Sequence, residues 1–266
     1  MCAVNLIKRF LKVKTMVEQI REVSVIIPTA DRSEMLNRAI RSVIGQTISS
    51  CKIIVVDNGR KEAQLDEDIV GAVEIVRTEP RIGPGRSRNI GAGVAESHYI
   101  AFLDDDDVWE PAYLEHSLTV FKHEGADAVV GQLKRACEDG AVRPYKMFPA
   151  YRKTQRSIYY RNPGFGGQNI VLKKDFFFRV GGFDETMPAS VDRDLCAKIL
   201  QSGGKIVPQP LSVAILCDHG GDRVRASGIK GNWMFIKKHF REMSLLEIAK
   251  AVRTLLKRHV RKITAE

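Results

Sequence analysis

The sequence predicts an α/β fold with a mainly parallel sheet flanked by helices, and three observations lead to this prediction. Apolar, β-branched runs recur along the chain, amphipathic or glycine-containing helical patterns separate them, and several runs end directly on an aspartate. Strands and helices that alternate at this spacing are typical of parallel sheets covered on both faces. A length of 266 residues suits one such domain with appendages.

Each element follows from a local pattern. The apolar runs predict strands at 23–29, 51–59, 72–76, 98–103, 127–131, within 161–172, and at 211–217. Helical periodicity predicts helices at 31–46, 86–97 and from Pro111 onward, and a further helix within 181–204 that stops at Gly203-Gly204. Asp31 is the expected N-cap of the first helix, with Glu34 three residues on.

The positive charge of the chain lies at its two ends. The net charge is +10, of which residues 1–22 carry +3 and residues 223–266 carry +9, so that 23–222 stands at −2. The chain is therefore divided into a basic N-terminal helical arm (1–22), a central domain (23–222) and a basic helical tail (223–266). One hypothesis, that the chain is a non-enzymatic, basic nucleic-acid-binding protein, is disfavoured because the central domain is acidic.

Cysteine usage and hydropathy indicate a reducing compartment and no membrane span. The five cysteines are scattered and never spaced as Cys-x-x-Cys, which predicts neither a zinc site nor a disulfide framework. No window approaches the ~20 uncharged residues that cross a bilayer. Lysine and arginine interrupt the first 14 residues, so no secretory signal is expected.

Four consecutive aspartates, Asp104 to Asp107, follow the apolar run HYIAFL. Capping of the next helix explains one of these acids and the helix dipole a second, but not four. Divalent cations such as Mg²⁺ or Mn²⁺ prefer carboxylate oxygens, cancel their repulsion and commonly bind substrate phosphates as well. The run therefore predicts a divalent metal site with a nucleotide ligand.

Aspartates also follow two other predicted strands, at Asp31 and Asp57. Ligands of parallel sheets bind beyond the carboxyl ends of the strands, so we expect these acids to share one crevice with Asp104. A P-loop nucleotidase is excluded, because the chain has no G-x-x-x-x-G-K-[ST]. The stretch IGPGRSRNIGAG fails the dinucleotide fingerprint, since Arg88 stands where its third glycine belongs.

Four segments together resemble the inverting glycosyltransferases of family 2, which have the GT-A fold. They are VSVIIPTADR, IIVVDNG, GRSRNIGAGVAESHYIAFLDDDDVW, and VGGFDE followed by VDRDL, and they cover about residues 23 to 220. The resemblance implies a GT-A-like, Rossmann-like sheet with a nucleotide-binding half (23–107) and an acceptor half (108–222). It also implies transfer of a sugar from a nucleotide diphosphate donor, often a UDP-sugar, to an acceptor hydroxyl.

The resemblance further implies which residues bind the nucleotide sugar. The first nucleotide loop corresponds to Pro28-Thr29-Ala30-Asp31, although the family usually has an aromatic residue and Asn in place of Ala30 and Asp31. Asp57 corresponds to the acid that hydrogen-bonds the base. The other implied donor-site residues are Arg86, Arg88, Asn89, Asp104 and Asp105. Alternatively, Arg86 and Arg88 would lie on the solvated side of a helix and have no role in donor binding.

The metal and the catalytic base are assigned by the same resemblance. Asp106 would hold Mn²⁺ or Mg²⁺, Asp107 would be a second ligand or a helix cap, and His219 resembles the family's late metal-facing histidine. Asp192 matches the catalytic acid, in a chain that has Val191-Asp192 where the family commonly has Glu-Asp. Helix capping by Asp192 or Asp194 is the structural alternative. Asp194 and Asp184 are the next candidates for the base.

The basic tail carries a capping-box pattern, Ser244 and Glu247, that opens a helix. Its predicted apolar face is Leu245, Ile248, Ala249, Val252, Leu255 and Leu256, and its other faces carry Lys250, Arg253, Lys257, Arg258, Arg261 and Lys262. Packing on the catalytic domain would explain the apolar face alone. The charge bias favours binding to an anionic membrane surface, with Trp233, Phe235 and Phe240 at the interface.

Together with the acidic run, the resemblance implies a metal-dependent inverting glycosyltransferase, expected to act in cell-envelope polysaccharide or glycolipid synthesis. Its partners would be a nucleotide-sugar donor and a glycan or lipid-linked acceptor, at the cytoplasmic face of a membrane. The enzymatic alternative is a sugar-nucleotide pyrophosphorylase. That class would need a glycine-rich loop with Arg and Lys near the first strand, which IIPTADRSE lacks.

Overall fold

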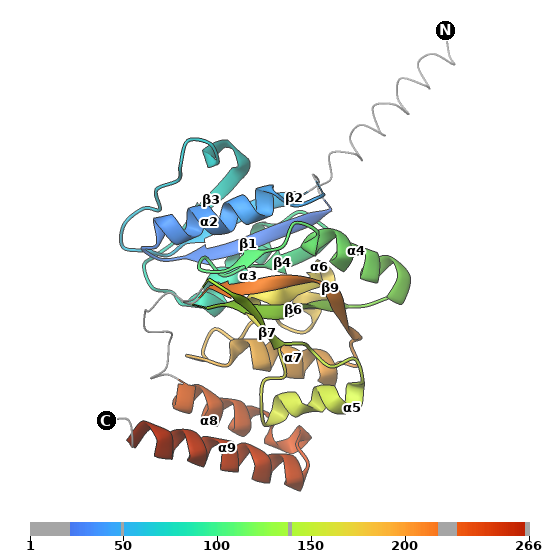
Figure 1. Ribbon diagram of the computed structural model, residues 1–266. Coiled ribbons are helices and arrows are strands. Elements are labelled where there is room, and N and C mark those ends of the chain that lie inside the picture. Colours follow the sequence, from blue (N-terminus) through green and yellow to red (C-terminus); the bar gives the residue numbers. More distant parts are fainter. Residues whose placement is uncertain (1–21, 49–50, 138–139, 218–227, 264–266) are drawn as a thin grey trace.

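The computed structural model describes residues 22–48, 51–137, 140–217 and 228–263 (Figure 1). Its strands are β1 (Val23–Thr29), β2 (Cys51–Asp57), β3 (Val73–Arg77), β4 (Tyr99–Phe102), β5 (Val108–Trp109), β6 (Ala128–Ala136), β7 (Val142–Lys146), β8 (Ile170–Lys173) and β9 (Ile206–Cys217). The α-helices are α2 (Ser33–Ile44), α3 (Pro84–Val94), α4 (Tyr113–Glu124), α5 (Arg152–Gln155), α6 (Lys174–Arg179), α7 (Val191–Gln201), α8 (Gly228–His239) and α9 (Leu245–Ile263). Short 3₁₀ helices are η1 (Val70–Ala72), η2 (Arg156–Tyr159), η3 (Gly167–Asn169) and η4 (Phe240–Glu242). The predicted N-terminal arm, up to residue 21, and His219 lie outside the described residues.

One sheet runs through the described part of the chain in the order β3-β2-β1-β4-β8-β6-β9-β5, with β7 paired to β6. Strands β3, β2, β1 and β4 are parallel, so that Thr29 and Asp57 are register partners at the carboxyl ends of β1 and β2. Strand β8 is antiparallel to β4 and β6, whereas β6 and β9 are parallel. The nucleotide-binding half expected from the sequence is therefore the fully parallel part of the sheet.

Helices cover both faces of this sheet, with α2 and α4 on one side and α3 and α7 on the other (Figure 1). Side chains alternate between the faces along a strand. In β1, Val25 and Ile27 join the core under α2, which includes Leu36, whereas Ile26 joins the opposite core with Ala92 of α3. All five of these side chains are fully buried.

The first four strands confirm the predicted ranges to within two residues, but β5 and β7 were not predicted from the sequence. Strand β5 has only two residues, and β7 contains Pro144, which a strand tolerates only at an edge or an irregular position. Asp31 was wrongly predicted to cap the first helix. That helix has no side-chain cap bond, and Asp31 Oδ1 instead accepts the Lys61 N–H at 3.0 Å, because the loop after β2 lies beside the end of β1.

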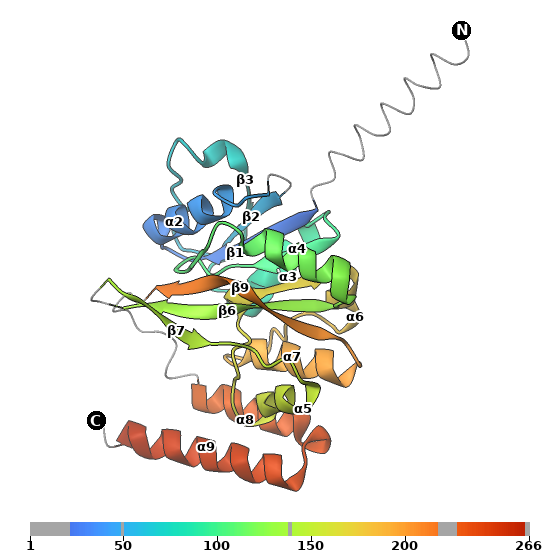
Figure 2. The same cartoon turned by 45° about the vertical axis from the view of Figure 1, so that its right-hand side comes forward.

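Helices α8 and α9 lie at the end of the molecule opposite β2 and β3 (Figure 2). Phe235 of α8 and Ala251 and Leu255 of α9 belong to the same apolar cluster as the core of α7. The predicted capping box is present, since the Ser244 N–H donates to Glu247 Oε2 at 2.8 Å and the Glu247 N–H donates to Ser244 Oγ at 3.3 Å. The C-terminal helices are thus continuous with the core of the domain.

The packed face of α9 differs from the predicted one. Ile248, Ala251 and Leu255 contact the core, whereas Leu245 and Leu256 are 86% and 60% exposed. Successive residues of a helix are rotated by about 100°, which places Leu245 and Leu256 beside this stripe rather than within it. No helix among the described residues is long and apolar enough to cross a membrane.

Helix α3 approaches the sheet most closely at Gly91. A Cβ atom at this position would lie 2.4 Å from Ile26 Cγ2 and 3.0 Å from Val56 Cγ2. Gly93, in the same helix, faces open space, with no heavy atom within 4 Å of an added Cβ. The two glycines therefore differ in packing while sharing one helix.

Gly91→Ala is expected to lower the free energy of unfolding by about 1–3 kcal/mol, because the added methyl group overpacks the sheet. Gly93→Ala, the matched control, should be neutral or raise it by up to about 1 kcal/mol through higher helix propensity. Urea unfolding followed by circular dichroism measures both. Equal midpoints for the two variants would contradict the close packing at Gly91.

Candidate active site

A cleft of about 590 Å³ lies beyond the carboxyl ends of β1, β2 and β4. Its walls are the loops after these strands, the start of α3 and part of η3. The volume is that of an ordinary small-molecule site. Of the predicted site residues, it brings together Pro28, Thr29, Asp31, Arg88, Asp104, Asp105, Asp106 and Asp107.

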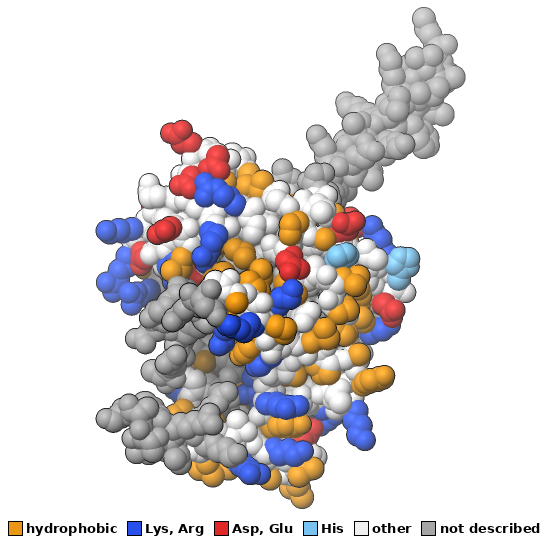
Figure 3. All heavy atoms as spheres, viewed as in Figure 1, with side chains coloured by type: hydrophobic (Ala, Val, Ile, Leu, Met, Phe, Trp, Pro, Cys, Tyr) orange, Lys and Arg blue, Asp and Glu red, His pale blue; other side chains and the backbone are white. Residues whose placement is uncertain are grey.

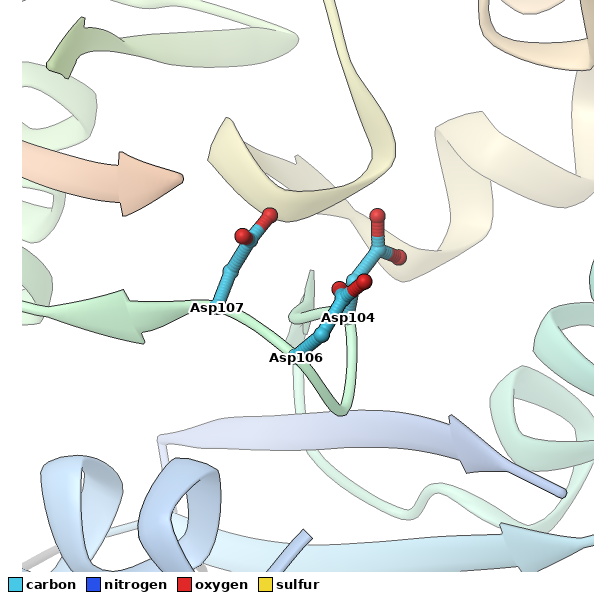
Figure 4. Close-up of side chains that lie close together, drawn as sticks. All are labelled: Asp104, Asp106 and Asp107. Atoms are coloured by element: carbon cyan, nitrogen blue, oxygen red, sulfur yellow. The ribbon is translucent and has the colours of Figure 1, made fainter. Parts of the chain in front are cut away.

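The acidic loop after β4 forms one wall of the cleft (Figure 4). Asp104, Asp106 and Asp107 each offer a carboxylate oxygen, and these three atoms lie within 4.8 Å of one another. Asp107 Oδ1 also accepts the Cys217 N–H at 3.0 Å, which ties the loop to the end of β9. Asp107 does not cap α4, whose first turn has no side-chain cap bond. The three oxygens form a suitable set of hard ligands for a divalent cation.

Asp105 connects the acidic loop to the loop after β1. Its carboxylate accepts the Thr29 hydroxyl at 2.7 Å and Arg32 Nη1 at 3.0 Å. Burial raises the pKa of Asp105 in spite of these two bonds. Arg32 Nη1 also lies 3.5 Å from Asp106 Oδ2, so one guanidinium balances two adjacent acids.

Arg88 is buried, and the charges of two carboxylates act on it. Its guanidinium forms an ion pair with Asp104 and lies 5.4 Å from the centre of the Phe183 ring. Burial disfavours its charge, but the neighbouring charges of Asp104 and Asp192 outweigh this effect and raise the pKa of Arg88. Gly167 leaves the space that the guanidinium needs, since a Cβ there would lie 2.5 Å from Nη2.

Asp192 is the second residue of α7 and is half-buried. Burial raises the pKa of its carboxyl to about 6, with Asp104 acting in the same direction and Arg88 in the opposite one. Its Oδ1 atom is buried and has no hydrogen-bond partner within the described residues. No side chain caps α7, so capping does not explain this aspartate. The geometry instead leaves a carboxylate oxygen beside the Arg88–Asp104 pair.

The two alternative bases face α8 rather than the cleft. Asp194 is fully buried, and one of its oxygens lies 2.8 Å from both Lys238 Nζ and His239 Nε2. Asp184 accepts a hydrogen bond from Lys238 at 2.6 Å and two from Thr186. Although burial acts against it, these bonds lower the pKa of Asp184 to about 2. Both acids are therefore held in ion pairs, and Asp192 is the better placed of the three.

Three predicted donor-site residues do not line the cleft. The Asp57 carboxylate accepts the N–H groups of Gly59 at 2.9 Å and Ala63 at 2.8 Å, and pairs with Arg77. Asn89 bonds the loop before α7, and Arg86 lines a neighbouring hollow. Their contacts with a donor, like the metal-binding role of His219, stay predictions.

Six cleft residues were not predicted from the sequence: Arg32, Asn58, Arg81, Gly83, Pro84 and Gln168. Arg32 and Asn58 directly follow Asp31 and Asp57, so their position after a strand was an available signal. Arg81 stands in a loop and Gln168 in η3, and neither follows a comparable sequence pattern. Only the fold places them at the cleft.

Comparison with known sequences decides the family. The sequence pattern of Glycosyl transferase family 2 matches residues 24–181, more than half of the chain. The chain belongs to glycosyltransferase family 2. This match confirms the resemblance inferred from the four sequence segments.

Several curated relatives carry glycosyltransferase names. An uncharacterized glycosyltransferase of Haemophilus influenzae is 28% identical over 182 residues, which are 67% of this chain and 62% of the relative. A pre-mycofactocin glycosyltransferase of Mycobacterium tuberculosis is 27% identical over 208 residues, 75% of this chain and 43% of the relative. A putative colanic acid biosynthesis glycosyl transferase of Escherichia coli is 25% identical over 231 residues, 82% of this chain and 81% of the relative. The chain therefore spans less than two thirds of the first two.

Solved structures of other glycosyltransferases share the fold. S. aureus TarS 1-349 in complex with UDP-GlcNAc has a TM-score of 0.67 and 18% identity, and the match covers 90% of this chain and 72% of TarS 1-349. GalNAc-T7 with UDP, GalNAc and Mn²⁺ has a TM-score of 0.62 and 19% identity, with 82% of this chain and 48% of GalNAc-T7 covered. The predicted GT-A-like α/β fold is confirmed.

Asp192→Asn is expected to stabilise the folded chain at neutral pH. The folded-state pKa of about 6 exceeds the ordinary 3.8, so the stability from this group is present at low pH and lost as the pH rises through about 6. An amide does not ionise, and the midpoint of thermal unfolding should exceed that of the parent chain at pH 8 but match it near pH 4.

Asp184→Asn is the matched control, with the opposite sign. Its folded-state pKa is lowered to about 2, so its charge stabilises the fold above the unfolded pKa, and the amide should lower the midpoint at pH 8. Thermal unfolding at both pH values measures the two effects. A lower midpoint for Asp192→Asn at pH 8 would contradict the raised pKa.

Proposed function

We propose that the chain is a metal-dependent inverting glycosyltransferase that moves a sugar from a nucleotide diphosphate donor to an acceptor hydroxyl. The observation that carries this proposal is the acidic loop at the cleft, whose Asp104 pairs with the cleft residue Arg88. Asp192 is not among the cleft-lining residues, but its charge acts on Arg88. Membership of family 2 supports the reaction class. UDP-GlcNAc in the TarS complex supports a UDP-sugar as the donor.

The residues of the acidic loop fit a divalent cation. Asp104, Asp106 and Asp107 would hold Mn²⁺ or Mg²⁺, with His219 as a further predicted ligand. When bound, the ion supplies electrostatic stabilisation of the charge that develops on the leaving diphosphate. Arg32 and Arg88 flank these acids and would contribute positive charge toward the same group.

Asp192 is the proposed general base. A carboxyl with a pKa of about 6 is mostly ionised at pH 7 and still accepts a proton from an acceptor hydroxyl. The buried Oδ1 atom, which lacks a partner among the described residues, is the oxygen available for this proton. Attack on the anomeric carbon in a single displacement would invert its configuration.

Two variants separate the two roles. Asp106→Ala should abolish metal-dependent binding of UDP-GlcNAc, because a ligand of the cation is lost. Asp192→Asn should keep this binding while donor turnover falls by ~10²–10⁴, because the amide accepts no proton. Calorimetry with and without Mn²⁺ measures the first effect, and UDP release measures the second.

Asp66→Ala is the control, because Asp66 is an acid outside the cleft that pairs with Arg41. It should leave both binding and turnover unchanged. Unaltered UDP-GlcNAc affinity in Asp106→Ala would disprove the metal assignment. Full turnover in Asp192→Asn would disprove the base assignment and leave the metal assignment standing.

The proposed setting is cell-envelope polysaccharide or glycolipid synthesis at the cytoplasmic face of a membrane. The name of the Escherichia coli relative supports a polysaccharide pathway, with a glycan or lipid-linked acceptor. The outer face of α9, defined as Leu245, Leu246, Lys250, Arg253 and Leu256, supports contact with an anionic membrane because it combines exposed apolar and basic side chains. Figure 3 shows both kinds along the lower edge, where α8 and α9 lie.

The aromatic part of the membrane prediction needs one correction. Trp233 and Phe240 are 54% and 50% exposed, but Phe235 is fully buried on the inner side of α8. Deletion of α9 is a poor test of membrane binding, because Leu255 belongs to the core and Arg156 bonds Glu247 at 2.7 and 3.0 Å. Substitution on the outer face leaves these contacts intact.

The variant Lys250→Gln/Arg253→Gln is expected to weaken binding to phosphatidylserine-containing vesicles about thirtyfold in low salt, at ~1 kcal/mol for each charge. Co-sedimentation measures this binding. Lys122→Gln, on α4, is the control and should change little. Equal binding by the double variant, or no binding by the parent chain, would disprove the membrane contact, and donor turnover should be unaffected throughout.

A further inference from the structure

A second hollow, of about 290 Å³, adjoins the proposed donor cleft. Its walls come from the start of α3, from the loop 185–188 that precedes α7, and from α8. Gly83 and Pro84 line both the hollow and the cleft, so only this short turn separates them. The two spaces therefore lie side by side.

The hollow carries two cations on different elements, Arg86 of α3 and Lys230 of α8. Both residues are exposed, and no hydrogen bond from either side chain to another described residue is present. Glu185 is the acid of the lining, and its Oε2 forms an ion pair with Arg86 Nε at 3.8 Å, which is longer than a hydrogen bond. Its Oε1 accepts a bond from Asn89 at 2.9 Å. The two cationic groups thus outnumber the one acid, and both remain exposed to a ligand, Arg86 with one exposed ion pair.

The volume of the hollow and its other lining residues indicate which kind of ligand it could bind. A volume near the lower limit of ordinary ligand sites suits a single sugar or phosphate-sized group rather than a whole nucleotide sugar. Met187 and Met234 supply apolar contact area beside the two cations. The first turn of α3 lies at one wall, and its helix dipole also favours negative charge.

The position of the hollow relates it to the proposed base. The lining residues Glu185 to Pro188 lead directly into α7, where Asp192 is the second residue. On the other side, Gly83 and Pro84 separate the hollow from the cleft assigned to the donor. A molecule in the hollow would therefore lie next to both the donor and the loop that precedes the helix of the base.

We propose that this hollow is an acceptor subsite that binds a phosphate- or carboxylate-bearing group of the acceptor through Arg86 and Lys230. The acceptor role rests on the proposed glycosyltransferase function, whereas anion binding does not. The inference moves Arg86 from the donor to the acceptor side. It also names a chemical class, an anionic glycan or glycerol phosphate-like group, for the acceptor.

Binding is tested with the full chain carrying ¹³C-methyl methionine, because Met187 and Met234 report locally on the hollow. Glycerol 3-phosphate and glucuronate are the anionic probes, and glycerol and glucose are their neutral counterparts. Both anions should shift these two methyl signals saturably, in the presence of saturating UDP and Mn²⁺ as well, while the neutral probes should not. A shift with only one anion would assign the subsite to phosphate or to carboxylate.

The variant Arg86→Gln/Lys230→Gln should weaken this binding about tenfold, the size expected for the loss of two partly exposed charge contacts. Lys122→Gln/Lys237→Gln removes the same charge outside the hollow and should leave the affinity unchanged. Equal shifts with neutral probes, unchanged affinity in the first variant, or complete loss of the shifts with UDP would each overturn the subsite. UDP release from UDP-GlcNAc, measured separately, shows whether the proposed function itself fails.

Discussion

A buried guanidinium must be paired, and the site depends on how Arg88 meets this constraint. Arg88 is 5% exposed, forms an ion pair with Asp104 of the acidic loop, and feels the charge of Asp192 of α7. An isolated charge at this depth would cost several kcal/mol, so the two carboxylates and the cation stabilise one another's positions. Arg88 and Asp104 belong to the proposed nucleotide-binding half and Asp192 to the proposed acceptor half, so the charge of Arg88 acts on carboxylates of both. One buried cation thereby influences both a proposed metal ligand and the proposed base.

The same arrangement explains why two nearby acids differ in chemistry. Asp192 keeps a raised pKa because burial acts on a carboxylate that forms few compensating bonds. Asp184 is held by Lys238 and Thr186, and its pKa falls to about 2. Proteins commonly separate the pKa values of two carboxyl groups through their surroundings. The group with the higher pKa can then serve as the proton acceptor. Here Asp184 and Asp194 are bound by α8, because Lys238 pairs with both acids and His239 contacts Asp194. Neither acid is therefore as well placed as Asp192 to accept a proton.

The C-terminal helices therefore have two uses that do not conflict. The inner side of α8 and α9 completes the core of α7, through Phe235, Ala251 and Leu255. The outer side remains exposed and carries the basic and apolar residues of the proposed membrane contact. One helix can serve both because its apolar residues extend around more of its circumference than the core covers. Lys230, at the start of α8, adds a third contribution at the rim of the second hollow.

The sequence by itself determined the strands β1 to β4, the acidic loop and the family, because these depend on short contiguous patterns. A buried strand that ends on an acid is visible locally, and Asp104 to Asp107 were located at the cleft for that reason. Only the tertiary structure decided which of these carboxylates face one another. It also decided that Asp57 bonds its own loop, that Arg86 lines the second hollow, and that Arg81 and Gln168 reach the cleft. Those outcomes depend on contacts between segments far apart in the chain, and no local pattern of residues encodes such contacts.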